Sequence, residues 1–341
     1  MSHNIDGNSM NFRTDLAIEE LNNSDKNAKI KEKQYGNIKI TNIIIDEKNR
    51  NLYNKKEGTY VTIEFVDATD FNNNKKIEEV FINELKIIMK KLKIKDEDTC
   101  LVIGLGNEKS TPDSLGPISL SNIIVTNHFY TLGINVEEGF RSTAVFSPGV
   151  MGQTGIETSD IIHAVVNEIK PDFIIVVDAL KASSIDRVNK TIQITDAGIN
   201  PGSGIGNNRK EISKNILGIP VIAIGIPTVV DIVTIVNDTF NYITNHFTYM
   251  KNNINKANEK LKVIRTNIDK DNVNSNDKKE LFGLVGSLNE EEVKALINEV
   301  LIPLGYNMIV TPKEIDFEIQ KLSNIIGNGI NNALHKNVTN L

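Results

Sequence analysis

Two aspartates are the residues whose positions best suit acid–base chemistry. Asp113 lies in "GLGNEKSTPDSLGP", residues 104–117, just after an apolar run, and Asp178 closes the apolar run "FIIVVD". In open α/β sheets, catalytic groups collect beyond the carboxyl ends of the strands. Two neighbouring carboxylates do not both ionise readily, so one can hold a proton while the other activates water. The spacing therefore makes Asp113 and Asp178 a candidate catalytic pair.

Each aspartate also has a structural interpretation. Asp113 precedes a predicted helix in "TPDSLG" and is suited to be its N-cap, so the pattern alone leaves both roles open. Asp178 ends a buried strand, where a charge needs a partner, and this favours a functional role.

The glycines around Asp113 give the stretch the look of a phosphate-binding turn. A dinucleotide fingerprint needs a third glycine where this sequence has Lys109, and there is no Gly-Lys-Ser/Thr ending. The pattern therefore argues against a nucleotide site and leaves Gly104, Gly106 and Asn107 as residues that line a site. A second glycine-rich loop, with Gly202 and Gly204, either lets a peptide approach closely or is a flexible turn.

The sequence favours no metal site and no cofactor. It has no HExxH motif, its five histidines are scattered, and Cys100 is its one cysteine. A lone cysteine excludes an internal disulfide and fits a reducing compartment. Carboxylates alone can bind hard cations, so a metal-dependent enzyme stays an alternative.

The elements that must position these residues follow from the apolar pattern. Buried strand-like runs occur at 99–106, 171–180 and 219–231, with helical segments between them. This alternation predicts an α/β fold, a mainly parallel twisted sheet with helices on both faces. Runs at 37–46 and 59–67 predict an antiparallel β excursion within residues 35–70, followed by a helix over 74–94. A short helix is predicted at 14–23, and residues 250–280 are predicted to form a polar helical excursion or a linker.

Composition limits the partners and the location. The chain has 341 residues and a net charge of −6, so no basic field indicates direct binding to nucleic acid. The N-terminus lacks the apolar core of a signal peptide, and no apolar run approaches the ~20 residues that a membrane span needs. These features predict a cytoplasmic protein without a membrane partner.

Several segments together resemble the germination protease family of endospore-forming bacteria. They are "GLGNEKSTPDSLGP", "SPGVMGQTGIETSD", "VVDAL", "RVNKTIQITDAGINPGSGIGNNR", "GIPVIAIGIPTVVD" and "TPKEIDFEI". The resemblance implies a fold similar to the hydrogenase maturation endopeptidases. It also implies an endopeptidase that degrades small acid-soluble spore proteins during germination, a homotetramer, and a location in the forespore or spore core. The catalytic aspartates of the family fall on Asp113 and Asp178. Two departures, Lys181 and Ala197, remove no proposed catalytic atom.

The resemblance also implies a zymogen. Family members remove a short propeptide by self-cleavage, and "TDLAIE", Thr14–Glu19, is similar to the sequence that they cut. The expected cut lies between Asp15 and Leu16, which gives a propeptide at 1–15 and a single α/β peptidase domain at 16–341. The alternatives are a metal-dependent, nickel-sensing-like maturation endopeptidase and a non-enzymatic nucleotide- or peptide-binding module.

Overall fold

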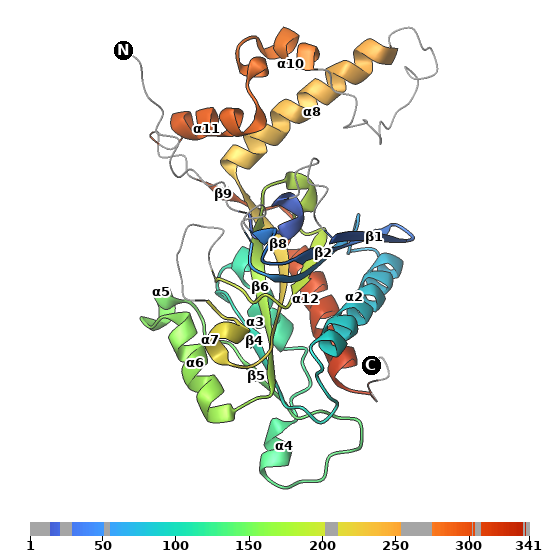
Figure 1. The fold of residues 1–341 in the computed structure, drawn as a ribbon, viewed down its shortest axis with the longest axis vertical. Coiled ribbons are helices and arrows are strands. Elements are labelled where there is room, and N and C mark those ends of the chain that lie inside the picture. Colours follow the sequence, from blue (N-terminus) through green and yellow to red (C-terminus); the bar gives the residue numbers. More distant parts are fainter. Residues whose placement is uncertain are drawn as a thin grey trace. The chain divides into compact units, whose positions relative to one another are not determined.

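The structure, a computed structural model, describes residues 14–20, 29–50, 55–201, 211–253, 275–301, 303, 308–336 and 338. The chain divides into two compact units. The larger unit contains the central sheet and carries both candidate aspartates, and the smaller unit is formed largely by Val230–Val310. Figure 1 shows the elements of both.

The strands of the sheet follow the order β1-β2-β3-β7-β8-β6-β4-β5, and β9 pairs with the end of β8, Val230 and Asp231, which belongs with β9 to the smaller unit. The strands are β1 Lys29–Tyr35, β2 Ile38–Ile45, β3 Gly58–Glu64, β4 Cys100–Gly104, β5 Thr143–Phe146, β6 Phe173–Ala182, β7 Thr191–Thr195, β8 Val221–Asp231 and β9 Ile309–Val310.

The mixed α/β class is confirmed, but the sheet is less parallel than the sequence predicts. The β4–β5 and β4–β6 pairs are parallel. The pairs β1–β2, β2–β3, β3–β7, β7–β8 and β8–β9 are antiparallel. The predicted antiparallel excursion is present as β2 and β3, with the unpredicted strand β1 added at its edge, and it joins the main sheet because β3 pairs with β7. Apolar runs identify buried strands but carry no information on direction, which long-range pairing decides.

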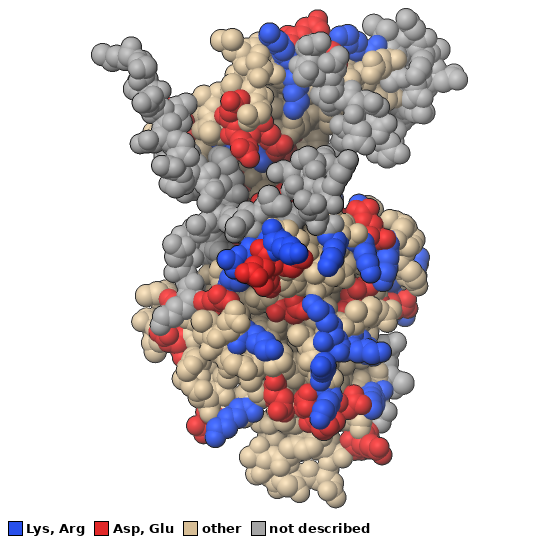
Figure 2. Space-filling view, viewed as in Figure 1, with Lys and Arg blue, Asp and Glu red and all other residues tan. Residues whose placement is uncertain are grey.

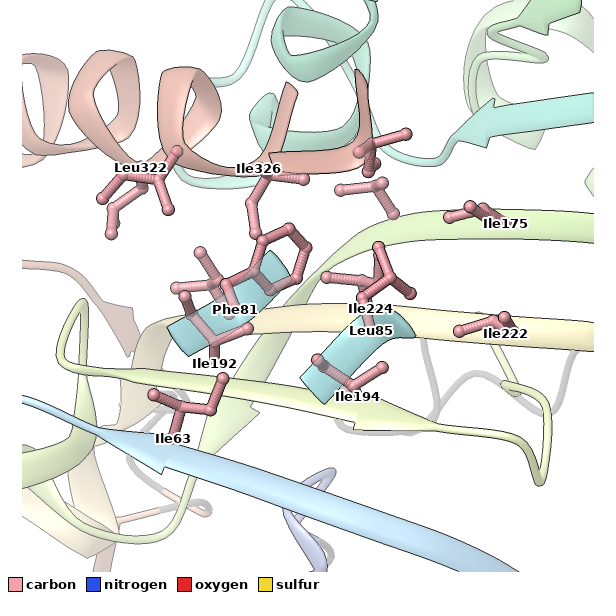
Figure 3. Close-up of a cluster of buried hydrophobic side chains, with 14 of the residues drawn as sticks. Ile63, Phe81, Leu85, Ile175, Ile192, Ile194, Ile222, Ile224, Leu322 and Ile326 are labelled. Atoms are coloured by element: carbon pink, nitrogen blue, oxygen red, sulfur yellow. The ribbon is translucent and has the colours of Figure 1, made fainter. Parts of the chain in front are cut away.

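Successive side chains of a strand point to opposite faces of the sheet, so a fully apolar strand gives both faces an apolar surface. Helices therefore pack on both faces. On one face, Val102 and Ile175 pack with α2 Phe71–Lys91, α3 Leu115–Leu120 and α12 Ile315–Leu334. Figure 3 shows this cluster, with Phe81 from α2 and Ile326 from α12 meeting strand residues. On the other face, Ile103 and Ile174 pack against α6 Thr158–Ile169 and α7 Lys214–Leu217.

The smaller unit is mainly helical. It contains α8 Ile232–Asn253, α10 Ser275–Phe282, the short 3-10 helix η6 Val285–Ser287 and α11 Glu290–Leu301. Phe240 of α8 packs edge to face on Phe282 of α10, with ring centroids 4.9 Å apart. Lys251 Nζ lies 2.8 Å from Asp277 Oδ1 and forms a salt bridge with it. Residues 254–274 of the predicted polar excursion lie outside the described residues.

The surface charges are of mixed sign, and the one cysteine is buried. Lysine, arginine and acidic side chains are interspersed on the face of the molecule that Figure 2 shows. Cys100 is buried in β4, and burial raises the pKa of its thiol. In the part of the chain that the structure describes, no helix combines the length and hydropathy that crossing a membrane requires.

Candidate active site

The Asp113 side chain lies in a tight turn that follows β4. Asp113 ends the 3-10 helix η2, Thr111–Asp113. The backbone N–H of Asn107 donates both to the Asp113 carbonyl oxygen, at 3.0 Å, and to its carboxylate Oδ2, at 2.9 Å. The N-cap of α3 is Ser114, so the interpretation of Asp113 as the cap of that helix is wrong. The carboxylate instead closes the turn that begins at the end of β4.

Glycines are needed at this turn because backbone segments approach one another closely. Gly106 has φ +114°, and a Cβ there would lie 1.9 Å from the Asp113 carbonyl oxygen. A Cβ on Gly116 would lie 2.6 Å from the carbonyl oxygen of Val177 in β6. Gly106 therefore lets the Asp113 turn close, and Gly116 lets the start of α3 pack against β6.

Asp178 lies within β6, which continues to Ala182, so the prediction that this aspartate ends the strand is wrong. Its side chain is 7% exposed, and its Oδ1 accepts the N–H of Ala179 at 3.0 Å. Ile174 and Val176 belong to the cluster that packs against α6. Alternate residues of a strand share a face, so Asp178 follows them on that side of the sheet.

Asp178 lies beside the carboxyl end of β4, from which the Asp113 turn begins. Gly104 pairs with Val177, and the N–H of Leu105 donates to the Val177 carbonyl oxygen at 2.8 Å. The 3-10 helix η2, which carries Asp113, contacts β6. From β8, Thr228 Oγ1 donates to the Pro112 carbonyl oxygen at 2.6 Å. Strands β4, β6 and β8 thus hold the Asp113 turn beside β6.

Two neighbouring residues support this turn and were not singled out from the sequence. Gln153, in α5 Met151–Thr154, donates from Nε2 to Asn107 Oδ1 at 2.5 Å. Ser147 Oγ donates to the Gly104 carbonyl oxygen at 3.3 Å. Both belong to "SPGVMGQTG", which the sequence shows only as a glycine-containing loop.

The segment around the expected cleavage position is docked on the sheet. Asp15 pairs with Lys181 of β6, since its N–H donates to the Lys181 carbonyl oxygen and its Oδ2 accepts the Lys181 N–H at 2.9 Å. Leu16 and Ala17 are fully buried. The predicted short helix at 14–23 is present, in the described residues, as the 3-10 helix η1 Ala17–Glu20.

A half-buried lysine holds the start of this segment. Lys55 Nζ donates to the Thr14 carbonyl oxygen at 2.5 Å. Burial lowers the pKa of Lys55, and the nearby carboxylates of Asp15, Glu20 and Glu19 partly offset that effect. Gly202 and Gly204, the other predicted lining residues, lie outside the described residues. No three His, Cys, Asp or Glu side chains gather as a metal site within the described ranges.

The class of protein follows from the fold and from comparison with known proteins. The mixed α/β fold brings the turn that carries Asp113 against β6, which carries Asp178, and a germination protease profile matches residues 4–340. The germination proteases of Priestia megaterium and Bacillus subtilis are each 44% identical to this chain. The first alignment covers 99% of the chain and 97% of the relative, and the second 98% and 96%. The chain therefore belongs to the germination protease family, and its activity is that of a protease.

Other comparisons agree or carry less weight. The germination protease of Oceanobacillus iheyensis is 46% identical over 96% of this chain and 95% of its own length. The hydrogenase maturation protease HycI of Thermococcus kodakarensis KOD1 is 14% identical, with a TM-score of 0.27. That match covers 41% of this chain and 80% of HycI, and with so low a TM-score it supports no argument.

Proposed function

We propose that this protein is the endopeptidase that begins the degradation of small acid-soluble spore proteins during germination. Asp113 and Asp178 are the catalytic pair: one carboxylate activates a water molecule, and the other donates a proton to the scissile carbonyl. The observation that carries this proposal is the contact of η2 with β6 beside the Gly104–Val177 pair. Family membership supports a protease, and this contact supports the choice of residues.

The protein is further proposed to be made as a zymogen. Residues 1–15 form the propeptide, and self-cleavage separates Asp15 from Leu16. The docking of Asp15 on Lys181, three residues along β6 from Asp178, supports a link between this segment and the site. We also propose that the protein forms a homotetramer in the forespore or spore core. Residues 16–341 then form one peptidase domain.

The test is incubation of the purified protein with a small acid-soluble spore protein, with and without a chelator. Mass spectrometry of the products reports activity, cleavage positions and metal dependence together. The aspartate proposal expects the same fragments in both reactions. Activity that chelation abolishes and added metal restores would favour a metal-dependent endopeptidase. Intact substrate in every reaction, with a chain already cut between Asp15 and Leu16, would reject the proposed function.

A further inference from the structure

Gln193, on β7, holds the backbone on both sides of Leu16. Its Nε2 donates to the Asp15 carbonyl oxygen at 3.1 Å, and its Oε1 accepts the Ala17 N–H at 2.7 Å. Gln193 is only 6% exposed. Both polar ends of one buried amide are thus used on a stretch of three residues, which orders that stretch more firmly than either bond alone.

Other groups hold the same segment from neighbouring elements. The backbone of Lys181 binds both the N–H and the carboxylate of Asp15. Further along, Glu19 lies 3.5 Å from Arg187, which also pairs with Glu64 at 2.5 Å. The segment is therefore anchored at both ends, and Gln193 binds the part between the anchors.

The docked position is unsuited to cleavage of the Asp15–Leu16 bond. Lys181 lies three residues beyond Asp178, which corresponds to about 10 Å along a strand. A catalytic acid or base must come within hydrogen-bond reach of the reacting group. In the docked segment the Asp15 carbonyl oxygen is bonded to Gln193, and the Leu16 side chain is fully buried. Water and the aspartates therefore reach this bond only after the segment is released.

We infer that Gln193 is a positioning residue that keeps the segment docked and delays its cleavage. This inference rests on the proposed cut between Asp15 and Leu16. When both Gln193 bonds open, the Asp15 carbonyl becomes accessible. Water then adds to the carbonyl carbon, the C–N bond breaks, Asp15 keeps the new carboxyl group and Leu16 leaves with the new amino group. Release of the segment limits the rate of this step.

Hydrogen exchange tests the holding role without any need for proteolysis. The full chain carrying Asp178→Asn is compared with the same chain that also carries Gln193→Leu. We expect the Ala17 amide to exchange at least about tenfold faster without Gln193, because two hydrogen bonds are lost. Gln193→Glu keeps the acceptor for Ala17 and should give an intermediate rate. It also serves as the second variant if Gln193→Leu lowers global stability. Gln34→Leu is the matched control, since Gln34 is an exposed glutamine that donates to the Gly36 carbonyl oxygen at 2.8 Å.

The rate of self-cleavage tests the delay. In the chain with Asp178 intact, Gln193→Leu should be processed at least about tenfold faster than the wild type, and Gln34→Leu at the wild-type rate. Unchanged exchange at Ala17 overturns the inference. Faster exchange with slower processing also overturns it and assigns Gln193 to productive binding of the cleaved chain. If the wild type and Gln193→Leu both stay uncut, the proposed cleavage and the delay fail together. The exchange rates then decide separately whether Gln193 holds the segment.

Discussion

Gly106 and Asp113 approach so closely that no side chain fits between them. A Cβ on Gly106 would lie 1.9 Å from the carbonyl oxygen of Asp113 and 3.1 Å from its Oδ1. The Asp113 turn therefore depends on this glycine for its position, and Gly106 also adopts φ +114°, which side chains disfavour.

Gly106→Ala should reduce proteolysis at least about tenfold and the free energy of unfolding by about 1–3 kcal/mol. The added methyl group must push the Asp113 turn away from the strand ends. Peptide cleavage assays and urea unfolding measure the two effects. Gly133→Ala is the control, because Gly133 also has a positive φ, +67°, but has nothing within 4 Å of the added Cβ. Equal activity in the two variants would show that the position of this turn does not matter.

Asp113→Asn and Asp178→Asn should each abolish self-cleavage and substrate cleavage while the fold survives. Asparagine has nearly the shape of aspartate but cannot serve as a general base. The Asn107 and Ala179 amides can still donate to its side-chain oxygen, so the local hydrogen bonds persist. Asp67→Asn, which changes a half-buried aspartate that accepts the N–H of Thr69, should leave activity unchanged. Near-normal activity in either of the first two variants, with circular dichroism unchanged, would rule out this pair.

The stability of the protein should fall between pH 6.5 and about pH 4 because of His335. This residue is 3% exposed, and burial, with a smaller contribution from Arg141, lowers its pKa from 6.5 to about 4. Between these pH values the unfolded chain binds a proton that the folded chain does not, so the free energy of unfolding decreases as the pH falls. The contribution is on the order of 2 kcal/mol.

Urea unfolding from pH 7.5 to pH 4 measures this effect. In His335→Gln the part of the pH dependence that belongs to His335 should disappear, while the side-chain oxygen can still accept the Arg141 N–H that binds His335 Nδ1 at 3.1 Å. His163→Gln, on α6, should keep the wild-type slope. Parallel curves for the wild type and His335→Gln would contradict the prediction.

Arg141 should be important for stability because its guanidinium donates to backbone carbonyl oxygens of two separate segments. It donates to the carbonyl oxygens of Lys95, at 2.6 Å, and Asp98, at 2.5 Å, and contacts that of Leu334 at 3.4 Å. Arg141→Met removes the hydrogen bonds of a buried side chain, since Arg141 is 4% exposed, and should cost about 2–4 kcal/mol. Lys336→Met, which removes the exposed pair with Asp96, should change the urea midpoint little. Similar midpoints for the two variants would contradict this difference.

The strands and helices that position the site were predictable because their apolar residues form continuous runs in the strands and recur at helical spacing in the helices. The expected strand at 99–106 is β4, that at 171–180 is β6, and the helix predicted over 74–94 is α2, Phe71–Lys91. Strand β1 was missed because every residue in it is exposed, so it has no alternation of buried and exposed side chains. The single helix expected after Asp113 is broken into α3 and α4 Asn127–Thr131.

The sequence by itself determined the α/β class, the choice of Asp113 and Asp178 as candidates and the resemblance to the germination protease family. Each of these depends on local order along the chain: apolar runs, the residues that end them, and long matching motifs. Tertiary structure alone decided the strand directions, the contact of the Asp113 turn with β6, and the hold of Gln193 on Asp15 and Ala17. Gln193 is 178 residues from Asp15, and only the pairing of β7 within the sheet places its amide beneath the segment. No local pattern encodes contacts over such separations, because they depend on how the whole sheet assembles.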